Sequence, residues 1–284
     1  DSTTDLTKEL VQELNIDVIP LEFTIEEKVY ENNLINPQIS SKDFYDKLRN
    51  GIASVTSQIN ATRYIDFFTP YLEKGMDILY LCFSSGLSGT YHSSVMACEE
   101  LQEKYPDRKI ITIDTFAASM GEGLLAWYAV SKKKSGQTIN EVAQWILDYR
   151  DHLAHWFTVD DLNHLKRGGR VSGAAAAFGT LLNIKPVMHV DNGGHLIPVY
   201  KVRGRRQSFD KMIDIMDKTF DKSIKQMIFI SHGDALEEAK YIEKMVREKF
   251  AKNILDVKIG DIGPVIGTHS GPGTLALFFI GSEK

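Results

Sequence analysis

The stretch that decides the fold reads Asp77-Ile-Leu-Tyr-Leu-Cys-Phe83 and then, without a break, Ser84-Ser-Gly-Leu-Ser-Gly-Thr-Tyr91. Its first part is a nearly continuous apolar run of strand length, which is typical of a parallel strand covered on both faces. The second part is a turn rich in glycine and hydroxyl residues that opens a helix reaching Glu103. A buried strand leading through such a turn into a helix predicts a βα unit.

Strands and helices continue to alternate on both sides of this unit. The opening Asp1–Asp5 resembles a strand-to-helix turn, which predicts a strand before it and a helix N-capped by Ser2 or Thr3. Thr56-Ser57-Gln58 is expected to be a polar loop. The other predicted elements are a strand at Asp17–Ile25, helical pieces at Phe44–Leu48 and Ile65–Leu72, a strand at Lys109–Asp114, and helices near Gly123–Lys133 and Ile139–Arg150. This order indicates βαβ units around a mainly parallel sheet.

The pattern changes near Ala154, so we expect two domains, 1–155 and 156–284. The turn at Asn192-Gly193 predicts a β-hairpin, because this pair readily adopts positive φ angles. The second half is therefore predicted to be α+β with a mainly antiparallel sheet. Its predicted strands are Trp156–Val159, Lys185–Asp191, His195–Lys201, Gln226–Ser231, Ile254–Ile259 and Thr274–Ile280, with helices at Ser208–Phe220 and Ala235–Phe250.

Composition excludes several classes of protein. Hydrophobic residues make up 43% and charged residues 25%, which is ordinary for a globular protein. A net charge of -5 argues against a protein that mainly binds nucleic acid. Cys82 and Cys98 are the only cysteines and lie in apolar-periodic stretches, which indicates buried thiols in a reducing compartment. With neither a membrane span nor a signal peptide in view, we expect a cytoplasmic protein.

The turn Ser84–Tyr91 is the strongest local indication of a site. Unpaired backbone N–H groups and hydroxyls converge there on the positive end of a helix dipole, an arrangement that can hold an anion. The simpler alternative is a tight βα connection with an N-capping serine. A polyphosphate would require a lysine that this turn lacks, so a small anion such as a carboxylate fits better.

Two enzyme motifs are matched in part. Gly86-Leu-Ser-Gly-Thr90 resembles the nucleophile elbow G-x-S-x-G except at its last position, and His269 could complete a serine acyl hydrolase with Ser88 and Asp160, Asp161 or Asp234. Gly121–Ala126 fits the dinucleotide pattern G-x-G-x-x-A, but Thr115–Ser119 separates it from the preceding strand. That separation disfavours a Rossmann site.

Other polar segments have both a structural and a functional interpretation. The basic loops Leu165–Arg170 and Lys201–Arg206 are either solvated faces or a docking patch. Gly263–Thr274 is expected to be a fixed irregular loop in which His269 is a plausible ligand contact. His152 and His155 lack further ligands that would complete a zinc pattern, so no metal site is expected.

Taken together, these segments resemble the DegV family of bacterial fatty-acid-binding proteins. The matching segments span nearly the whole chain in order. They are Asp1–Leu6, Thr56–Gln58, Ser85–Tyr91, Asp161–Ser172 with its Arg-Gly-Gly-Arg, Asn183–Pro186, Lys201–Gly204 and Gly263–Thr274. The resemblance implies an N-terminal three-layer α/β/α domain, a C-terminal α+β domain and one long-chain fatty acid, of the C14–C18 class, in a buried tunnel between or beside the domains.

The resemblance also implies a set of ligand-binding residues. The carboxylate contacts fall on Thr56, with its neighbour Ser57, and on Ser88 and the Gly89 amide. The surrounding polar network takes in the residues His269, Thr274, Arg167 and Arg170. The family commonly continues Thr-Ser-Gln with proline and a small hydroxyl residue, whereas this chain has Ile59-Asn60, which predicts a less rigid loop and weaker coupling to a partner.

The resemblance further implies a binding protein rather than an enzyme. A protein of this kind presents the acyl carboxylate to a separate ATP-dependent fatty acid kinase, and the acyl phosphate then feeds phospholipid synthesis. The resemblance implies no cofactor or metal, no nucleic-acid partner, and allows transient contact with a membrane. Burying about 15 methylenes at ~0.8 kcal/mol each is on the order of 12 kcal/mol before association costs, so the tail should supply most of the affinity.

Overall fold

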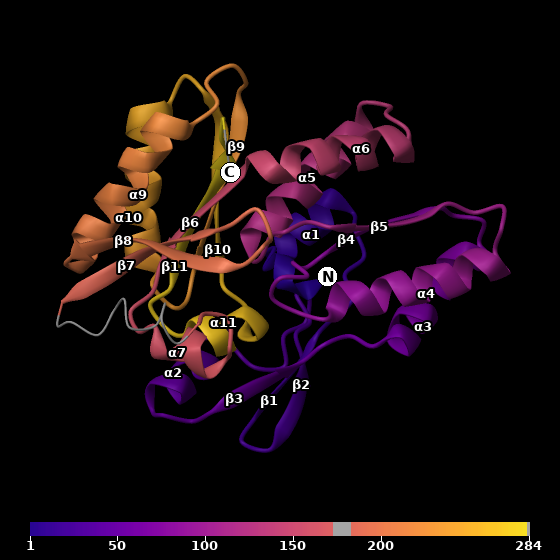
Figure 1. The fold of residues 1–284 in the computed structure, drawn as a ribbon, viewed down its shortest axis with the longest axis horizontal. Coiled ribbons are helices and arrows are strands. Elements are labelled where there is room, and N and C mark those ends of the chain that lie inside the picture. The colour runs from indigo at the N-terminus through magenta and orange to yellow at the C-terminus, as the bar shows by residue number, and fades with distance from the viewer. Residues whose placement is uncertain (173–182, 283–284) are drawn as a thin grey trace.

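The computed structural model describes residues 1–172 and 183–282. In Figure 1 the N-terminal half occupies the right and bottom of the view, and the C-terminal half occupies the left. The elements of the N-terminal half are η1 Ser2–Thr4, α1 Lys8–Leu14, β1 Glu22–Ile25, β2 Lys28–Glu31, α2 Ser41–Arg49, β3 Ser54–Ser57, α3 Ala61–Glu73, β4 Ile78–Cys82, α4 Thr90–Lys104, β5 Ile110–Asp114, α5 Met120–Lys134, α6 Ile139–Tyr149 and η2 Arg150–His152.

The predicted βαβ unit is confirmed. β4 and β5 are parallel neighbours, with Ile78 opposite Ile110 and Cys82 opposite Asp114. α3 and α4 cover one side of this pair in Figure 1, while α1, α5 and α6 lie on the other. The pair is flanked by helices on both faces, as its nearly continuous apolar sequence predicts.

A separate three-stranded sheet in the order β2-β1-β3 was not expected. Both of its pairings are antiparallel, and Phe23 of β1 lies opposite Thr56 of β3. Thr56 and Ser57 therefore end a strand, and the prediction of a loop there is wrong. The strand predicted at Asp17–Ile25 is also shorter, since β1 begins at Glu22.

The C-terminal half is built on a six-stranded sheet in the order β10-β9-β11-β6-β7-β8. Only β9 and β10 are parallel within it, so the prediction of a mainly antiparallel sheet is confirmed. Its elements are β6 Leu153–Thr158, α7 Asn163–Arg167, β7 Ile184–Val190, β8 Leu196–Arg203, α9 Arg205–Thr219, β9 Gln226–His232, α10 Leu236–Phe250, β10 Ile254–Asp261, α11 Pro264–Ser270 and β11 Leu275–Ile280.

Two further expectations are corrected. The first α-helix begins at Lys8 and is capped by the Thr7 side chain, because Ser2 and Thr3 form a 3-10 turn instead. The segment Gly263–Thr274 contains the helix α11, with Pro264 at its first turn, where a missing N–H costs nothing. The predicted hairpin is confirmed, since β7 and β8 pair antiparallel on either side of Asn192-Gly193.

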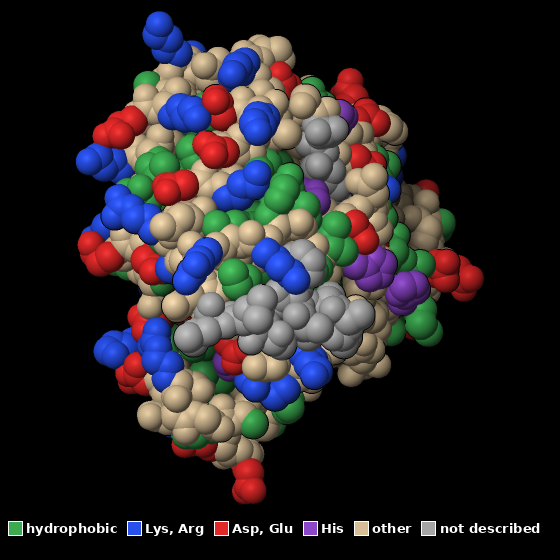
Figure 2. Space-filling model, turned by 60° about the vertical axis from the view of Figure 1, so that its left-hand side comes forward, with side chains coloured by type: hydrophobic (Ala, Val, Ile, Leu, Met, Phe, Trp, Pro, Cys, Tyr) green, Lys and Arg blue, Asp and Glu red, His purple; other side chains and the backbone are tan. Residues whose placement is uncertain are grey.

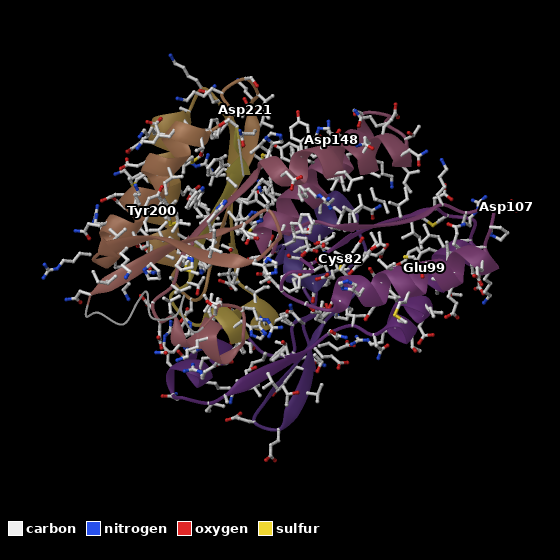
Figure 3. The ribbon with its side chains drawn as sticks, in the orientation of Figure 1. Cys82, Glu99, Asp107, Asp148, Tyr200 and Asp221 are labelled. Carbon is white, nitrogen blue, oxygen red and sulfur yellow. The ribbon has the colours of Figure 1, made fainter. Side chains whose placement is uncertain are left out.

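The largest of three hydrophobic core clusters in the described residues spans the two halves. It joins Leu6 and Leu124 of the N-terminal half to Phe157, Phe229 and Phe278 of the C-terminal sheet. The predicted boundary after residue 155 falls inside β6, so a division into two domains remains a prediction that fits better just before Leu153. Both cysteines are buried free thiols, as predicted, and Cys82 lies in the interior of Figure 3 where β4 ends.

The glycines of the G-x-G-x-x-A match lie inside α5 rather than in a strand-to-helix turn. A Cβ added at Gly121 would lie 2.5 Å from His155 Nε2 and 2.8 Å from Phe278 Cδ1. Gly121 therefore allows α5 to pack closely on the large sheet, and Gly123 allows it to pack on Leu6 and the Thr4 carbonyl. None of the described helices has both the length and the apolar character needed to cross a bilayer.

Candidate ligand-binding site

A cavity of about 280 Å³ lies where the two halves meet. Its volume is near the lower end of the range for small-molecule sites in proteins. Most of its wall is apolar and comes from both halves of the chain. The apolar wall residues are Leu21, Phe83, Leu87, Ala118, Phe157, Leu165, Val190, Leu196, Ile262, Val265, Ile266, Ala276 and Phe278.

Most of the residues assigned to the ligand from the resemblance line this cavity. They are Thr56, Ser57, Ser88, Gly89, Arg170, His269 and Thr274. Gln58 brings two of their segments together, because its side chain contacts the position a Cβ would take on Gly89. The end of β3 therefore meets the start of α4 at the cavity.

The start of α4 has the features of an anion site. Gly89 is the N-cap residue and has no side chain to bond the free N–H groups of the first turn. The Thr90 N–H donates to Ser88 Oγ at 3.2 Å, and the Ser88 and Thr90 hydroxyls lie 2.8 Å apart. Within the described chain, the Gly89 N–H makes no hydrogen bond. An anion here would meet a free amide, a hydroxyl and the positive end of a helix of 15 residues.

His269 connects the C-terminal half to the strand carrying Thr56. Its Nε2 lies 2.8 Å from Thr56 Oγ1, while its Nδ1 is buried against Gly168. Burial, with a smaller effect from the Arg170 charge, lowers the pKa of His269 to about 4. The imidazole is therefore neutral at pH 7, and its role in this geometry is to orient the Thr56 hydroxyl.

This arrangement does not support the serine hydrolase alternative. A triad needs the histidine on the serine hydroxyl and a carboxylate on the other ring nitrogen. Here the hydroxyl of Ser88 pairs with Thr90, and His269 pairs with Thr56. No side chain in the described residues bonds His269 Nδ1.

Arg170 contributes a cation beside the start of α4. Its Nε donates to the Leu87 carbonyl at 3.2 Å, and an Nη1 hydrogen bond goes to the Gly168 carbonyl. Burial lowers the pKa of Arg170, although a guanidinium stays charged at neutral pH. Arg167 is exposed on α7, bonds His164, and does not line the cavity.

Thr274 faces the cavity from the start of β11, but its hydroxyl proton is already engaged. Oγ1 lies 2.9 Å from the carbonyls of both Ser270 and Gly271, at the end of α11. The side chain is 2% exposed. Thr274 therefore fixes the turn between α11 and β11, and can offer a ligand only an acceptor.

Ile59 and Asn60, which replace the usual family residues, both have partners in the structure. Ile59 is fully buried in a cluster with Tyr64 and Phe68. The Asn60 side chain accepts a hydrogen bond from the Arg63 N–H at 3.0 Å and so caps α3. Both residues contact the α3 region just after β3, and the expectation of a less rigid loop stays a prediction.

The sequence-based prediction missed several wall residues, among them Ser119 and His155. His155 is 1% exposed on β6, where Nδ1 lies 2.9 Å from the Leu153 carbonyl. The nearly continuous apolar sequence of Leu153–Thr158 is typical of a strand buried on both faces, which would have placed this histidine inside. Ser119 is 4% exposed and has φ 54° and ψ -149°, a conformation that the sequence does not reveal. Within the described residues, no cluster of His, Cys, Asp or Glu side chains could hold a metal ion.

A family model described as "Uncharacterised protein, DegV family" matches residues 1–282. The chain belongs to the DegV family. It is 46% identical over 284 residues to the DegV domain-containing protein CPE0026 of Clostridium perfringens, covering 100% of this chain and 97% of that protein. The family resemblance inferred from the sequence motifs is therefore confirmed.

Solved DegV structures share the fold of the whole chain. A DegV family protein from Thermus thermophilus, described for its fatty acid binding, is 27% identical with a TM-score of 0.86, over 98% of this chain and 96% of that one. The Fatty Acid Kinase B3 protein of Streptococcus pneumoniae, loaded with linoleic acid, is 21% identical with a TM-score of 0.82, over 92% and 90%. Because the second protein is only 21% identical, its similarity shows a shared fold and nothing more.

Proposed function

We propose that this DegV protein binds one long-chain fatty acid in the cavity between its halves. The observation that carries the proposal is a mainly apolar cavity with a hydroxyl-rich, cationic cluster where β3 meets the start of α4. In this arrangement the alkyl tail lies among residues such as Phe157 and Phe278. The carboxylate lies against Thr56, Ser57, Ser88 and the Gly89 amide.

The Thermus thermophilus relative supports this proposal, because it is described as a fatty-acid-binding protein and shares the fold over nearly the full length. Physical chemistry supports it as well. A buried carboxylate needs hydrogen-bond donors, and the start of α4 together with Arg170 provides them. The apolar wall gives the tail its affinity, while the polar cluster determines which end of the ligand lies there.

The direct test is to denature protein purified from its natural source or a bacterial host and identify extracted lipids by mass spectrometry. We expect one C14–C18 fatty acid per chain. A delipidated sample should take up hexadecanoate at a stoichiometry of one. Protein that is empty as purified and takes up no fatty acid of these lengths would refute the proposal.

We further propose that the bound carboxylate is presented to a separate fatty acid kinase, which forms the acyl phosphate used in phospholipid synthesis. Exposed basic residues at the end of β8 and the start of α9 would serve for docking. Arg203 and Arg206 are exposed, and Arg206 lies 4.1 Å over the Tyr241 ring. Arg205 instead ion-pairs with Glu238 and Asp160, so it holds the fold together. Figure 2 shows this side, where Lys and Arg side chains stand among Asp and Glu.

The docking proposal is tested by charge reversal at Arg203 and Arg206. The double variant R203E/R206E should slow acyl-phosphate formation by a cognate kinase and retain hexadecanoate binding. The matched control is K133E, a charge reversal at an exposed site on α5 in the other half. Equal rates for R203E/R206E and K133E would refute the docking proposal and show that these arginines only face solvent.

A further inference from the structure

Asp5 is a buried acid at the junction of four segments, and the binding site proposed above does not use it directly. Its side chain is 3% exposed, and its backbone is left-handed with φ 49°. Oδ1 accepts the Gly263 N–H at 2.9 Å, and Oδ2 lies 2.6 Å from Ser119 Oγ. Ser119 in turn lies 2.9 Å from Ser231 Oγ on β9. One carboxyl group therefore joins the first turn of the chain, the start of α5, and the residue that precedes α11.

The bond to Gly263 matters because of what α11 carries. Gly263 is the N-cap residue of α11, and the last turn of this seven-residue helix holds His269 against Thr56. The preceding carbonyl, of Ile262, accepts a hydrogen bond from the Tyr45 hydroxyl at 2.8 Å. A Cβ on Gly263 would lie 2.7 Å from Asp5 Oδ1, so the backbone passes unusually close to the carboxyl group. The start of α11 is thus held by side chains from the other half of the molecule.

The Ser119 contact gives a second reason to assign Asp5 a function. Ser119 lines the cavity in a backbone conformation that is rare for any residue with a side chain. Such strain persists only where surrounding contacts impose it, and the bonds to Asp5 and Ser231 are contacts of that kind. Asp5 therefore bonds both a residue of the cavity wall and the helix that orients the carboxylate-facing hydroxyl.

We propose that Asp5 is a positioning residue that aligns α11, and through His269 the Thr56 hydroxyl, for recognition of the ligand carboxylate. The inference rests on the proposed fatty-acid site. It assigns Asp5 no contact with the ligand. Loss of the Asp5 bonds should therefore reduce the preference for a carboxylate over an uncharged headgroup more than it reduces binding of the tail.

Asparagine provides the conservative comparison. Burial raises the pKa of Asp5 to about 8, with Asp261 adding to the effect, so the group is mainly protonated at pH 7. Tyr45 and Glu122 are the other titratable side chains influenced by its charge. An asparagine has the same shape, can accept the Gly263 N–H through Oδ1, and can donate to Ser119 through Nδ2. D5N should therefore keep α11 in place, whereas D5A should release it.

The experiment compares hexadecanoate with its methyl ester, by calorimetry on delipidated protein, in wild type, D5N, D5A and T3V. We expect D5A to lower the acid-to-ester preference about tenfold or more, the effect of one lost hydrogen bond to a charged group, and D5N to retain it. T3V is the matched control, since Thr3 is buried beside Asp5 and bonds Glu122 and Asp1 but not α11. A folded D5A with the wild-type preference, or D5N and D5A equally impaired, would overturn the proposal.

A second measurement needs no ligand. Titration of the His269 imidazole by NMR should give a pKa near 4 in wild type and D5N, and a value nearer 6.5 in D5A as the ring becomes hydrated. If D5A does not fold, S119A removes one of the two bonds and should shift both readouts in the same direction by less. An unchanged His269 pKa in D5A, or in S119A where D5A does not fold, overturns the inference. Wild-type protein that binds neither acid nor ester overturns the proposed function separately.

Discussion

At the scale of single residues, the two hydroxyls assigned to the carboxylate are prepared in different ways. Thr56 Oγ1 lies 2.8 Å from the neutral His269 ring, so its direction depends on a side chain from the other half of the molecule. Ser88 Oγ is held locally, by the Thr90 N–H and hydroxyl. The affinity for a carboxylate that contacts both hydroxyls therefore depends on how the two halves are aligned as well as on the hydrogen bonds themselves.

The first residue-scale prediction concerns headgroup selectivity. T56V and S88A should each weaken hexadecanoate binding by at most about 1.5–3 kcal/mol, because each removes one hydrogen bond to a charged acceptor and leaves the tail contacts in place. The methyl ester should lose less than the acid in both variants. Calorimetric titration measures the four affinities. Equal losses for acid and ester would show that the hydroxyls shape their loops without contacting the carboxylate.

The second residue-scale prediction concerns stability and pH. Burial raises the pKa of Asp5 from 3.8 to about 8, so between these values the folded protein binds a proton that the unfolded chain releases. Stability from this group is complete at low pH and is lost as the pH rises, by about 1.4 kcal/mol per unit inside the window. The stability difference between D5N and wild type should grow from pH 5 to 8 and then level off, in urea titrations.

Glu122 is buried as well, and its raised pKa gives a slope of the same sign in both proteins. The Asp5 charge is the smallest of the causes that raise this pKa, so most of the Glu122 contribution cancels in the comparison. A difference between D5N and wild type that stays constant from pH 5 to 8 would mean that Asp5 is ionised in the folded state. The conservative role of asparagine at this position would then need another explanation.

At the scale of elements, the glycine at position 121 of α5 serves close helix packing. Gly121 brings the helix against His155 and Phe278, which both line the cavity. G121A would force these side chains to move, so it should destabilise the fold by about 1–3 kcal/mol and weaken fatty acid binding. The control is S131A, an exposed site on the same helix, where the change should stay within about 0.5 kcal/mol. Thermal denaturation and calorimetry measure both effects. Wild-type stability for G121A would show that the helix can move away.

Two elements near the site show where local sequence is insufficient. In β3 the sequence Ser-Val-Thr-Ser is mostly polar, and its strand conformation comes from pairing with β1, about 30 residues away along the chain. In α11 the glycines argue against a helix, because glycine costs conformational entropy. Glycine is needed at position 267, because a Cβ there would lie 2.5 Å from the Tyr45 hydroxyl. Tertiary contacts decide both elements, so the sequence pattern predicted a loop in each.

At the scale of the whole molecule, the parts with strong local patterns were predicted correctly. The apolar run before Ser84, the Asn-Gly hairpin and the antiparallel second sheet follow from period, length and turn chemistry. The polar residues of the candidate site were predicted from sequence motifs that occur in the family's order along the chain. The apolar wall could not be predicted, since it combines residues as distant as Leu21 and Phe278, and only the folded chain brings them together.

The shared wall leads to a prediction about the entire chain. Residues of both halves line the cavity, and one core cluster spans them, so a ligand there should stabilise both halves together. At a free concentration 100 times its Kd, hexadecanoate should add about 2.7 kcal/mol to the free energy of unfolding. Delipidated protein should unfold in one transition by scanning calorimetry, and saturating ligand should move that transition as a whole to higher temperature.

Methyl hexadecanoate at the same concentration is the control and should produce a smaller shift, because it lacks the anion that the start of α4 and Arg170 are arranged to hold. If the melt instead divides into two transitions and the ligand moves only one, the cavity belongs to one half, and the contacts that join Asp5 and Thr56 to α11 do not couple the halves.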